Sequence, residues 1–282
     1  MTSTSNTRGV VLITGCASGI GKALALAFHA KGHLVCATAR RVDALAPLKD
    51  IGILTYPLDV TDAQGLAALM THLKADGLHV DTLVNNAGYG AMGPLLDMPA
   101  HEWQKQFDVN VFGPMSLIRS VLPDMIQRRR GLIVNISSVS GVMPTPFAGA
   151  YCASKAAVNA LSDTLRMEVA PFGIRVVAVQ PGGIQSGFGE AAGQGLQLAP
   201  ESPYQRVRDA ILARAHGGQE NATPAEVFAA RMVEQVMNPS CPAVVRLGEK
   251  SKLMPTLKQW LPERWLDRVL QRRFGLDRLA DS

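Results

Sequence analysis

Short apolar runs rich in β-branched residues alternate along the chain with longer segments whose apolar positions recur at helical spacing. The runs predict strands at 9–14, 33–39, 53–60, 80–86, 131–137, 174–180 and 243–247, and the spacing predicts helices near 19–31, 62–75, 101–128, 150–172 and 224–237. Nearly continuous apolar strands that alternate with helices are typical of a parallel sheet covered on both faces. We therefore predict an α/β fold, a single doubly wound domain with about seven strands.

The end of the chain, residues 249–282, continues beyond this pattern as a predicted amphipathic helical extension. Leu266, Val269, Leu270 and Phe274 recur at helical spacing, and arginines lie mostly on the other side. A basic amphipathic helix with tryptophans can lie on a membrane surface, or it can pack on protein. We favour packing on protein over peripheral membrane contact.

Composition and charge exclude several classes of protein. The net charge of +5 is mild, so no nucleic-acid partner is expected. The N-terminus lacks the apolar core of a signal peptide, and no window approaches the ~20 apolar residues of a membrane span, so we expect a cytoplasmic protein. Cys16, Cys36, Cys152 and Cys241 lack C-x-x-C or Cys/His ligand spacing, so we expect buried thiols of a reducing compartment and no metal site.

A glycine-rich turn, T-G-C-A-S-G-I-G at 14–21, follows the first strand and opens a helix. Glycines let the backbone approach a pyrophosphate, and the N-terminus of a helix favours an anion. A tight turn alone also requires glycine, and the spacing departs from G-x-G-x-x-G. Its position in a βαβ unit nevertheless favours a Rossmann-type dinucleotide site, whose residues here would be Gly15, Ser18, Gly19, Ile20 and Gly21.

The end of the second strand indicates which dinucleotide binds. Sites that prefer NAD place an acid here for the ribose 2′-hydroxyl, whereas an arginine accommodates a 2′-phosphate. In this chain Ala39 stands in place of the acid, and Arg40 and Arg41 follow it. A guanidinium matches a phosphate in geometry and charge. We therefore predict NADP, with NAD as the alternative and a solvated basic turn as the structural explanation.

Two further strand ends carry small or polar residues that suit a flat cofactor. Asp59 and Val60 follow the third strand, where Asp59 can meet an adenine ring. Asn86, Ala87 and Gly88 follow the fourth strand, where small residues allow close packing against a ring, although N-N-A-G is also compatible with a simple turn. We assign all five to the cofactor site.

Tyr151 and Lys155 lie four residues apart at the start of the predicted helix 150–172, which places both on one helix face. A phenol titrates near ~10 when unperturbed. A neighbouring ammonium lowers that pKa, so Tyr151 can exchange a proton with a carbonyl or an alcohol. Ser138 follows the strand 131–137 and can hold the reacting oxygen. The alternative is a serine-rich loop before an ordinary amphipathic helix.

Asn110 is a polar residue in an apolar part of the predicted helix 101–128. Such a residue is usually a satisfied structural amide. It can also kink the helix and anchor a water molecule.

Taken in order, these motifs resemble the short-chain dehydrogenase/reductase superfamily over roughly residues 8–247. The resemblance implies that Tyr151 is the general acid/base and that Ser138 positions the substrate oxygen. It implies that Lys155 lowers the tyrosine pKa and holds the nicotinamide ribose, and that Asn110 completes a proton relay through water. It further implies a homodimer or homotetramer, and a catalytic domain over 1–248 with its substrate loop at about 183–224.

The family's segment after the sixth strand matches Pro181, Gly182, Ile184 and Ser186, which would line the nicotinamide. The pattern is most similar to members that act on hydroxysteroids, retinoids or aldehydes. An apolar pocket is expected from residues of the substrate loop and of the segment before Tyr151, namely Phe188, Leu196, Leu198, Val142, Met143 and Phe147.

The predicted function is an NADP-dependent oxidoreductase that interconverts a carbonyl and an alcohol on an apolar substrate through a Ser-Tyr-Lys-Asn site. Two alternatives remain open. One is a 3-oxoacyl thioester reductase, which would need a surface for an acidic carrier protein. The other is a catalytically silent NADP(H)-binding sensor or scaffold, against which the presence of Ser138, Tyr151 and Lys155 argues.

Overall fold

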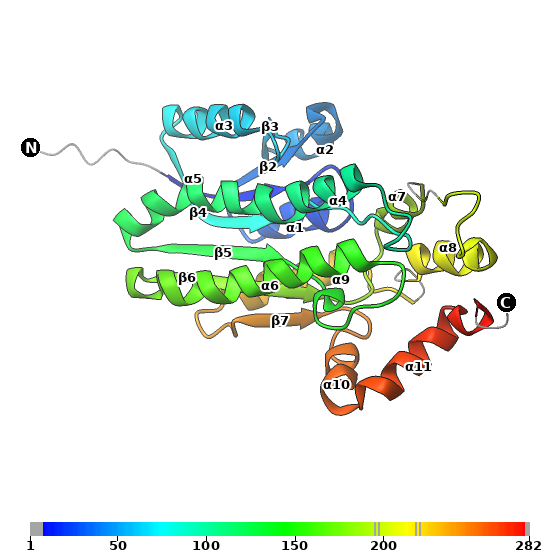
Figure 1. Cartoon of the computed structure of the whole chain (residues 1–282). Coiled ribbons are helices and arrows are strands. Elements are labelled where there is room, and N and C mark those ends of the chain that lie inside the picture. Colours follow the sequence, from blue (N-terminus) through cyan, green and yellow to red (C-terminus); the bar gives the residue numbers. More distant parts are fainter. Residues whose placement is uncertain (1–7, 195, 197, 218, 220, 280–282) are drawn as a thin grey trace, which may run out of the picture.

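The computed structural model describes residues 8–194, 196, 198–217, 219 and 221–279 and shows a central sheet between two layers of helices (Figure 1). Residues 1–7 and 280–282, parts of the predicted N- and C-terminal segments, lie outside these ranges. The strands are β1 (Arg8–Thr14), β2 (Val35–Ala39), β3 (Leu54–Pro57), β4 (Leu78–Asn85), β5 (Gly131–Ile136), β6 (Ile174–Pro181) and β7 (Val244–Leu247).

The seven strands are all parallel and lie in the order β3-β2-β1-β4-β5-β6-β7, which confirms the predicted doubly wound sheet. The chain builds outward from β1 to one edge and then returns to pair β4 with β1. Ligands of such sheets bind outside the carboxyl ends of the strands at this reversal. The fold therefore places the candidate site between the ends of β1 and β4.

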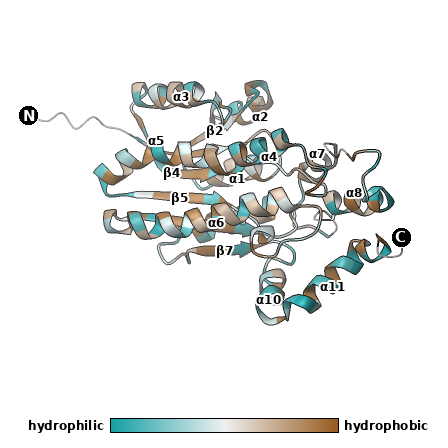
Figure 2. Ribbon diagram, in the orientation of Figure 1, coloured by the Kyte–Doolittle hydropathy of each residue, from teal (hydrophilic) through white to brown (hydrophobic). Residues whose placement is uncertain are grey.

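Alternate residues of each strand face opposite layers. Val11 and Ile13 of β1 pack with the layer of α1 (Gly19–Ala30), α2 (Ala46–Lys49) and α9 (Ala225–Met237). Val10 and Leu12 pack with the layer of α3 (Ala63–Ala75), α5 (Gly113–Arg128) and α6 (Gly149–Val169). Figure 2 shows hydrophobic residues along the central strands. Burial on both faces explains why the strands read as continuous apolar runs.

The predicted continuous helix at 101–128 is instead three segments. α4 (Ala100–Phe107) leads into a π-helical turn, Asp108–Phe112, and then into α5. Asn110, in the π-turn, is buried and hydrogen bonds to Tyr89 and Ser154 of other segments. These bonds tie the π-turn to the neighbouring segments, and such turns are often found at functional sites.

The segment predicted as a glycine-rich loop contains a short helix, α7 (Phe188–Gln194), before α8 (Arg208–His216). The C-terminal extension forms α10 (Leu253–Trp260) and α11 (Glu263–Arg273), and α7, α8 and α11 all lie at the end of the sheet toward which the strands point (Figure 1). The remaining short 3₁₀ turns are Val42–Leu45, Val139–Gly141, Ala170–Phe172, Gln205–Val207 and Leu276–Leu279.

The extension packs on the protein through one face of α11. Leu266 and Phe274 are buried, and Leu270 and Phe274 join a cluster with Phe147 and Ile211. Trp265, on the opposite side, is exposed. This face of α11 therefore packs on protein. Within the described ranges no helix combines the length and apolarity that crossing a bilayer requires.

Candidate active site

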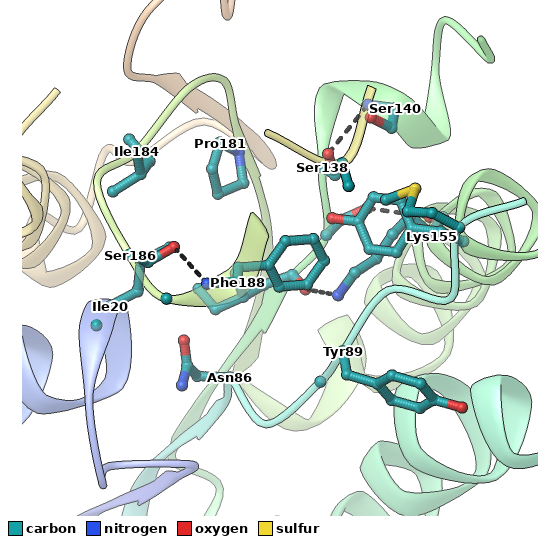
Figure 3. Close-up of a pocket in the computed structure, with 18 of the residues that line it drawn as sticks. Ile20, Asn86, Tyr89, Ser138, Ser140, Lys155, Pro181, Ile184, Ser186 and Phe188 are labelled. Atoms are coloured by element: carbon teal, nitrogen blue, oxygen red, sulfur yellow. Dashed lines mark hydrogen bonds between the residues drawn. The ribbon is translucent and has the colours of Figure 1, made fainter. Parts of the chain in front are cut away.

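A cavity of about 1160 Å³ opens at the carboxyl ends of the strands and collects most of the residues that the sequence singled out. Its lining includes Gly15, Ser18, Gly19, Ile20, Gly21, Arg40, Asp59, Val60, Asn86, Ala87, Gly88, Ser138, Tyr151, Lys155, Pro181, Gly182, Ile184 and Ser186. In Figure 3, Ser138 and Lys155 lie across the cavity from Ile20 and Asn86. The volume exceeds that of a typical small-ligand pocket, so it suits an extended cofactor together with a substrate.

The glycine-rich turn meets the ends of β1 and β4 too closely for side chains. Gly15 has φ +74°, and a Cβ there would lie 2.9 Å from the Cα of Ala87. A Cβ on Gly21 would overlap the carbonyl oxygen of Gly15. The side chain of Asn86 donates to the carbonyl of Thr14 at 2.8 Å, and the Thr14 hydroxyl accepts from the backbone N–H of Asn86 and of Ala87, each at 3.0 Å.

This arrangement leaves the backbone of the turn bare at the N-terminus of α1, which fits a dinucleotide pyrophosphate. The clasp formed by Thr14 and Asn86 explains how the two loops stay together. Thr14 was not singled out from the sequence, because its partners lie about seventy positions away in the chain.

At the end of β2, Arg40 supplies a cation at the place where sites that prefer NAD have an acid. Ala39 and Arg40 line the cavity, but Arg41, which we assigned to the cofactor, lies outside the lining. Arg41 lies beyond the end of β2, where it is exposed immediately before the 3₁₀ turn Val42–Leu45. Burial tends to raise the pKa of Asp59, but hydrogen bonds from Thr61 and the charge of Arg40 outweigh it and lower that pKa.

Ser138 and Tyr151 meet on the far side of the cavity. Ser138 is the residue before the 3₁₀ turn Val139–Gly141, and its hydroxyl accepts from the backbone N–H of Ser140 at 3.1 Å. Tyr151 lies in the first turn of α6, and its ring packs against that of Phe188 with centroids 5.3 Å apart. Both polar residues are nearly buried, at 8% and 9% exposure.

The pKa of Tyr151 shifts in the direction opposite to the one predicted from its spacing with Lys155. Burial raises the pKa of the phenol, while the Ser138 hydroxyl and the charge of Arg214 act to lower it. The Lys155 ammonium lies 5.9 Å from the centroid of the tyrosine ring. At this separation it does not outweigh the loss of water around the phenol.

Lys155 is held by the backbone at the end of β5. Its Nζ donates to the carbonyl of Ile136 at 2.8 Å, and burial lowers its pKa from 10.5 to about 8. A Cβ on Gly88 would lie 3.6 Å from Nζ and 3.0 Å from Oδ1 of Asn110, so both side chains approach this glycine.

Asn110 lies beside the cavity but outside its lining. Its Oδ1 accepts from the backbone N–H of Tyr89 at 3.1 Å, and its Nδ2 donates to the carbonyl of Tyr89 at 3.0 Å and to the Ser154 hydroxyl at 3.1 Å. These bonds satisfy the amide and fix the backbone that follows β4, and the proton relay through water implied for Asn110 stays a prediction.

The substrate side of the cavity differs from the apolar pocket that we predicted. Of the six apolar residues, Phe188 and Met143 line the cavity. Phe147 packs instead against Tyr204 and Phe274, and the remaining three, Val142, Leu196 and Leu198, also lie outside the lining. Two arginines line it as well: Arg214 of α8, which the sequence did not single out, and Arg273 of α11, which we expected on the polar side of the C-terminal helix.

The four cysteines are free; Cys16, Cys36 and Cys152 are buried, as expected, whereas Cys241 is partly exposed. In the described part of the chain, no cluster of three or more His, Cys, Asp or Glu side chains could hold a metal ion.

Comparison with known proteins defines the class. The family model for short chain dehydrogenases matches residues 9–196. A short-chain dehydrogenase of Penicillium ochrochloron is 41% identical over 235 residues, covering 82% of this chain and 85% of that protein. The NADPH-dependent 1-acyldihydroxyacetone phosphate reductase of Schizosaccharomyces pombe is 38% identical over 245 residues, covering 84% and 79%. A crystal structure of a short-chain dehydrogenase from Streptomyces avermitilis superposes with a TM-score of 0.78 at 31% identity, covering 98% of both chains.

The chain therefore belongs to the short-chain dehydrogenase family. It is an oxidoreductase that interconverts a CH–OH group and a carbonyl with a nicotinamide cofactor.

Proposed function

We propose that this protein is an NADP(H)-dependent oxidoreductase whose substrate is a largely apolar carbonyl compound or the corresponding alcohol. The observation that carries the proposal is the meeting of Ser138, Tyr151 and Lys155 in one cavity that also contains the bare glycine turn. Phe188 and Met143 supply apolar surface beside the tyrosine. Residues 1–248 serve as the catalytic domain, and the segment at about 183–224 supplies the substrate side.

The roles of the side chains follow from their protonation states. Because burial keeps the pKa of Tyr151 above its ordinary value, the phenol is protonated at neutral pH and can donate a proton to a carbonyl oxygen. The Ser138 hydroxyl holds that oxygen beside the phenol. Lys155, with a pKa of about 8, remains mainly charged at pH 7 and stabilises the phenolate that forms. A bound nicotinamide would supply or accept the hydride.

The preference for NADP rests on Arg40. Ala39 leaves no carboxylate at the end of β2 to accept from a ribose 2′-hydroxyl, and Arg40 lines the cavity. A guanidinium suits a 2′-phosphate in both charge and shape. The name of the Schizosaccharomyces pombe relative, an NADPH-dependent reductase, is consistent with this preference.

The test is NADPH consumption by the purified protein across a carbonyl panel, with Tyr151→Phe as the variant. The panel contains long-chain aldehydes, steroid ketones, retinal and acetoacetyl thioesters. We expect turnover of at least one apolar class, loss of at least about 100-fold in Tyr151→Phe, and unchanged NADPH binding. Turnover of thioesters alone would favour a 3-oxoacyl thioester reductase. NADPH binding without turnover of any carbonyl would favour a sensor or scaffold.

We also propose that the chain forms a homodimer or homotetramer through the outer faces of α5 and α6. Phe112 is 56% exposed just before α5, and Met167 is 62% exposed on α6. Large apolar side chains exposed on neighbouring helices suit contact with a second copy.

We assign α11 to the wall of the cavity in preference to membrane contact, because Leu266 and Phe274 on its inner face are buried. A cytoplasmic location agrees with the absence, among the described helices, of any that could span a membrane.

A further inference from the structure

Arg214 is a cation in the substrate side of the cavity that the proposed reaction does not use. It lies near the end of α8 and lines the same cavity as Ser138 and Tyr151. Its charge acts on the phenol of Tyr151, and burial lowers the pKa of the guanidinium itself. Burying a charge is costly unless it is paired. Arg214, at this position in the cavity, is therefore expected to have an anionic partner.

The orientation of the guanidinium is fixed from one side. Its Nε donates to the Thr145 hydroxyl at 2.8 Å, and Thr145 belongs to the loop between Ser138 and Tyr151. The two Nη groups have no hydrogen-bond partner within the described part of the chain, and they carry the paired donors that match a carboxylate or a phosphate. Among the side chains that the structure describes, no Asp or Glu forms an ion pair with Arg214.

A second guanidinium, that of Arg273, lines the same cavity. Arg273 lies at the end of α11, and its charge further lowers the pKa of Arg214. Two like charges on one wall repel each other and would both be stabilised by an anion between or beside them. The neighbouring surface is apolar, because Phe274 and Leu270 of the same helix line this part of the cavity.

We propose that the substrate carries an anionic group, a carboxylate or a phosphate, which Arg214 binds while Tyr151 acts on the reacting oxygen. This inference rests on the proposed function and narrows its substrate class from apolar carbonyl compounds to amphipathic anions. The apolar chain lies along Phe188, Met143 and Phe274. Arg273 adds to the positive potential at the anionic end. Arg214 thus selects the substrate and also sets its distance from the phenol.

The test compares matched pairs of substrates that differ only in charge. Oxidation of 2-hydroxyoctanoate and of 3-hydroxyoctanoate is measured beside that of their methyl esters. Reduction of a long-chain ketone that carries a phosphate monoester is measured beside its dephosphorylated form. We expect kcat/KM of the wild type to be roughly 10- to 100-fold higher for one anion than for its neutral partner, the range that a charge-assisted hydrogen bond supplies. The pair that responds identifies the carboxylate or the phosphate.

The variant Arg214→Gln should remove most of that preference, so that kcat/KM falls much further for the anion than for its neutral partner. Arg208→Gln is the matched control, because Arg208 lies exposed at the start of the same helix and outside the cavity lining. It should leave the preference unchanged. Calorimetric titration of octanoate and of octanol into the NADPH-loaded protein gives a readout that needs no turnover. Octanoate is expected to bind more tightly in the wild type, and Arg214→Gln to abolish the difference.

Equal kcat/KM for the anionic and neutral members of every pair in the wild type would overturn the inference, and this comparison does not depend on the folding of any variant. If the neutral partners are turned over and Tyr151→Phe abolishes this, the proposed function stands while the anionic subsite fails. If no member of any pair is turned over and octanoate binds no better than octanol, both fail. A loss in Arg214→Gln that is equal for both members of a pair would assign Arg214 to structure alone.

Discussion

Burial of the Lys155 ammonium should cost the folded chain stability that a substitution can recover. Burial lowers the pKa of Lys155 from 10.5 to about 8, a difference of about 2.5. Each unit corresponds to about 1.4 kcal/mol, so the folded chain carries a penalty of about 3 kcal/mol when the lysine is charged. Replacement by methionine removes the charge and retains an apolar stem of similar length. It also removes the hydrogen bond to the carbonyl of Ile136, which is worth about 1 kcal/mol.

The penalty depends on pH in a defined way. Below pH 8 the lysine is charged in both the folded and the unfolded chain, and the full penalty applies. Between pH 8 and 10.5 the unfolded chain binds more protons than the folded one, so stability rises with pH as the penalty disappears. We therefore expect Lys155→Met to raise the free energy of unfolding by about 2 kcal/mol at pH 7 and by close to zero at pH 10.

Urea unfolding followed by circular dichroism, at pH 7 and at pH 10, measures this difference. Taking wild type and variant at the same pH cancels the titration of all other groups. Lys22→Met is the control, because Lys22 is exposed on α1 and its replacement should change stability by less than about 0.5 kcal/mol at either pH. Destabilisation of Lys155→Met at pH 7, or a gain that does not change with pH, would refute the reasoning. The same variant should lose turnover, so that stability and activity change in opposite directions.

The remaining predictions concern the cofactor, the π-turn and the assembly. Arg40→Asp should lower the ratio of kcat/KM with NADPH to that with NADH by at least about 10-fold, whereas Arg41→Asp, which makes the same charge change outside the cavity, should lower it far less. Asn110→Leu should lower the free energy of unfolding by about 2 kcal/mol, measured in urea, because buried backbone groups of the segment after β4 lose their hydrogen-bond partner. The control Gln104→Leu, on the exposed surface, should have little effect on that free energy. Met167→Glu should shift sedimentation of micromolar protein toward the monomer, and a wild type that already sediments as a monomer would contradict the proposed assembly.

The sheet could be predicted because its signal is local. Strands buried on both faces appear as apolar runs, and the observed strands begin and end within three residues of the predicted positions. The glycine turn could also be predicted from the sequence. A side chain at Gly15 or Gly21 would collide with the backbone, so glycine is required at these positions. Tyr151 and Lys155 were linked by helical spacing alone.

Other features depend on contacts between residues that are distant in the sequence, so no local pattern predicts them. The π-turn contains Asn110, whose amide hydrogen bonds to Tyr89 and Ser154 in other parts of the chain. Arg214 lies in a helix whose apolar and polar positions show no clear face, and only its tertiary bond to Thr145 reveals that it enters the cavity. Phe147, in contrast, lies next to the active segment in sequence but turns into a different cluster.

The charges that line the cavity affect both the stability of the folded chain and its affinity for anionic ligands. The described lining contains six lysines and arginines, namely Arg40, Lys105, Lys155, Arg214, Lys250 and Arg273, against three carboxylates, Asp59, Asp108 and Glu249. Lys155 and Arg214 both have lowered pKa values because of burial, so the folded chain bears the cost of holding them before any ligand arrives. An anionic cofactor at one end of the cavity and an anionic substrate at the other would each relieve part of this cost. Part of their binding free energy would then come from charges that the fold already holds in place. The site is accordingly expected to bind anions at the expense of stability in their absence.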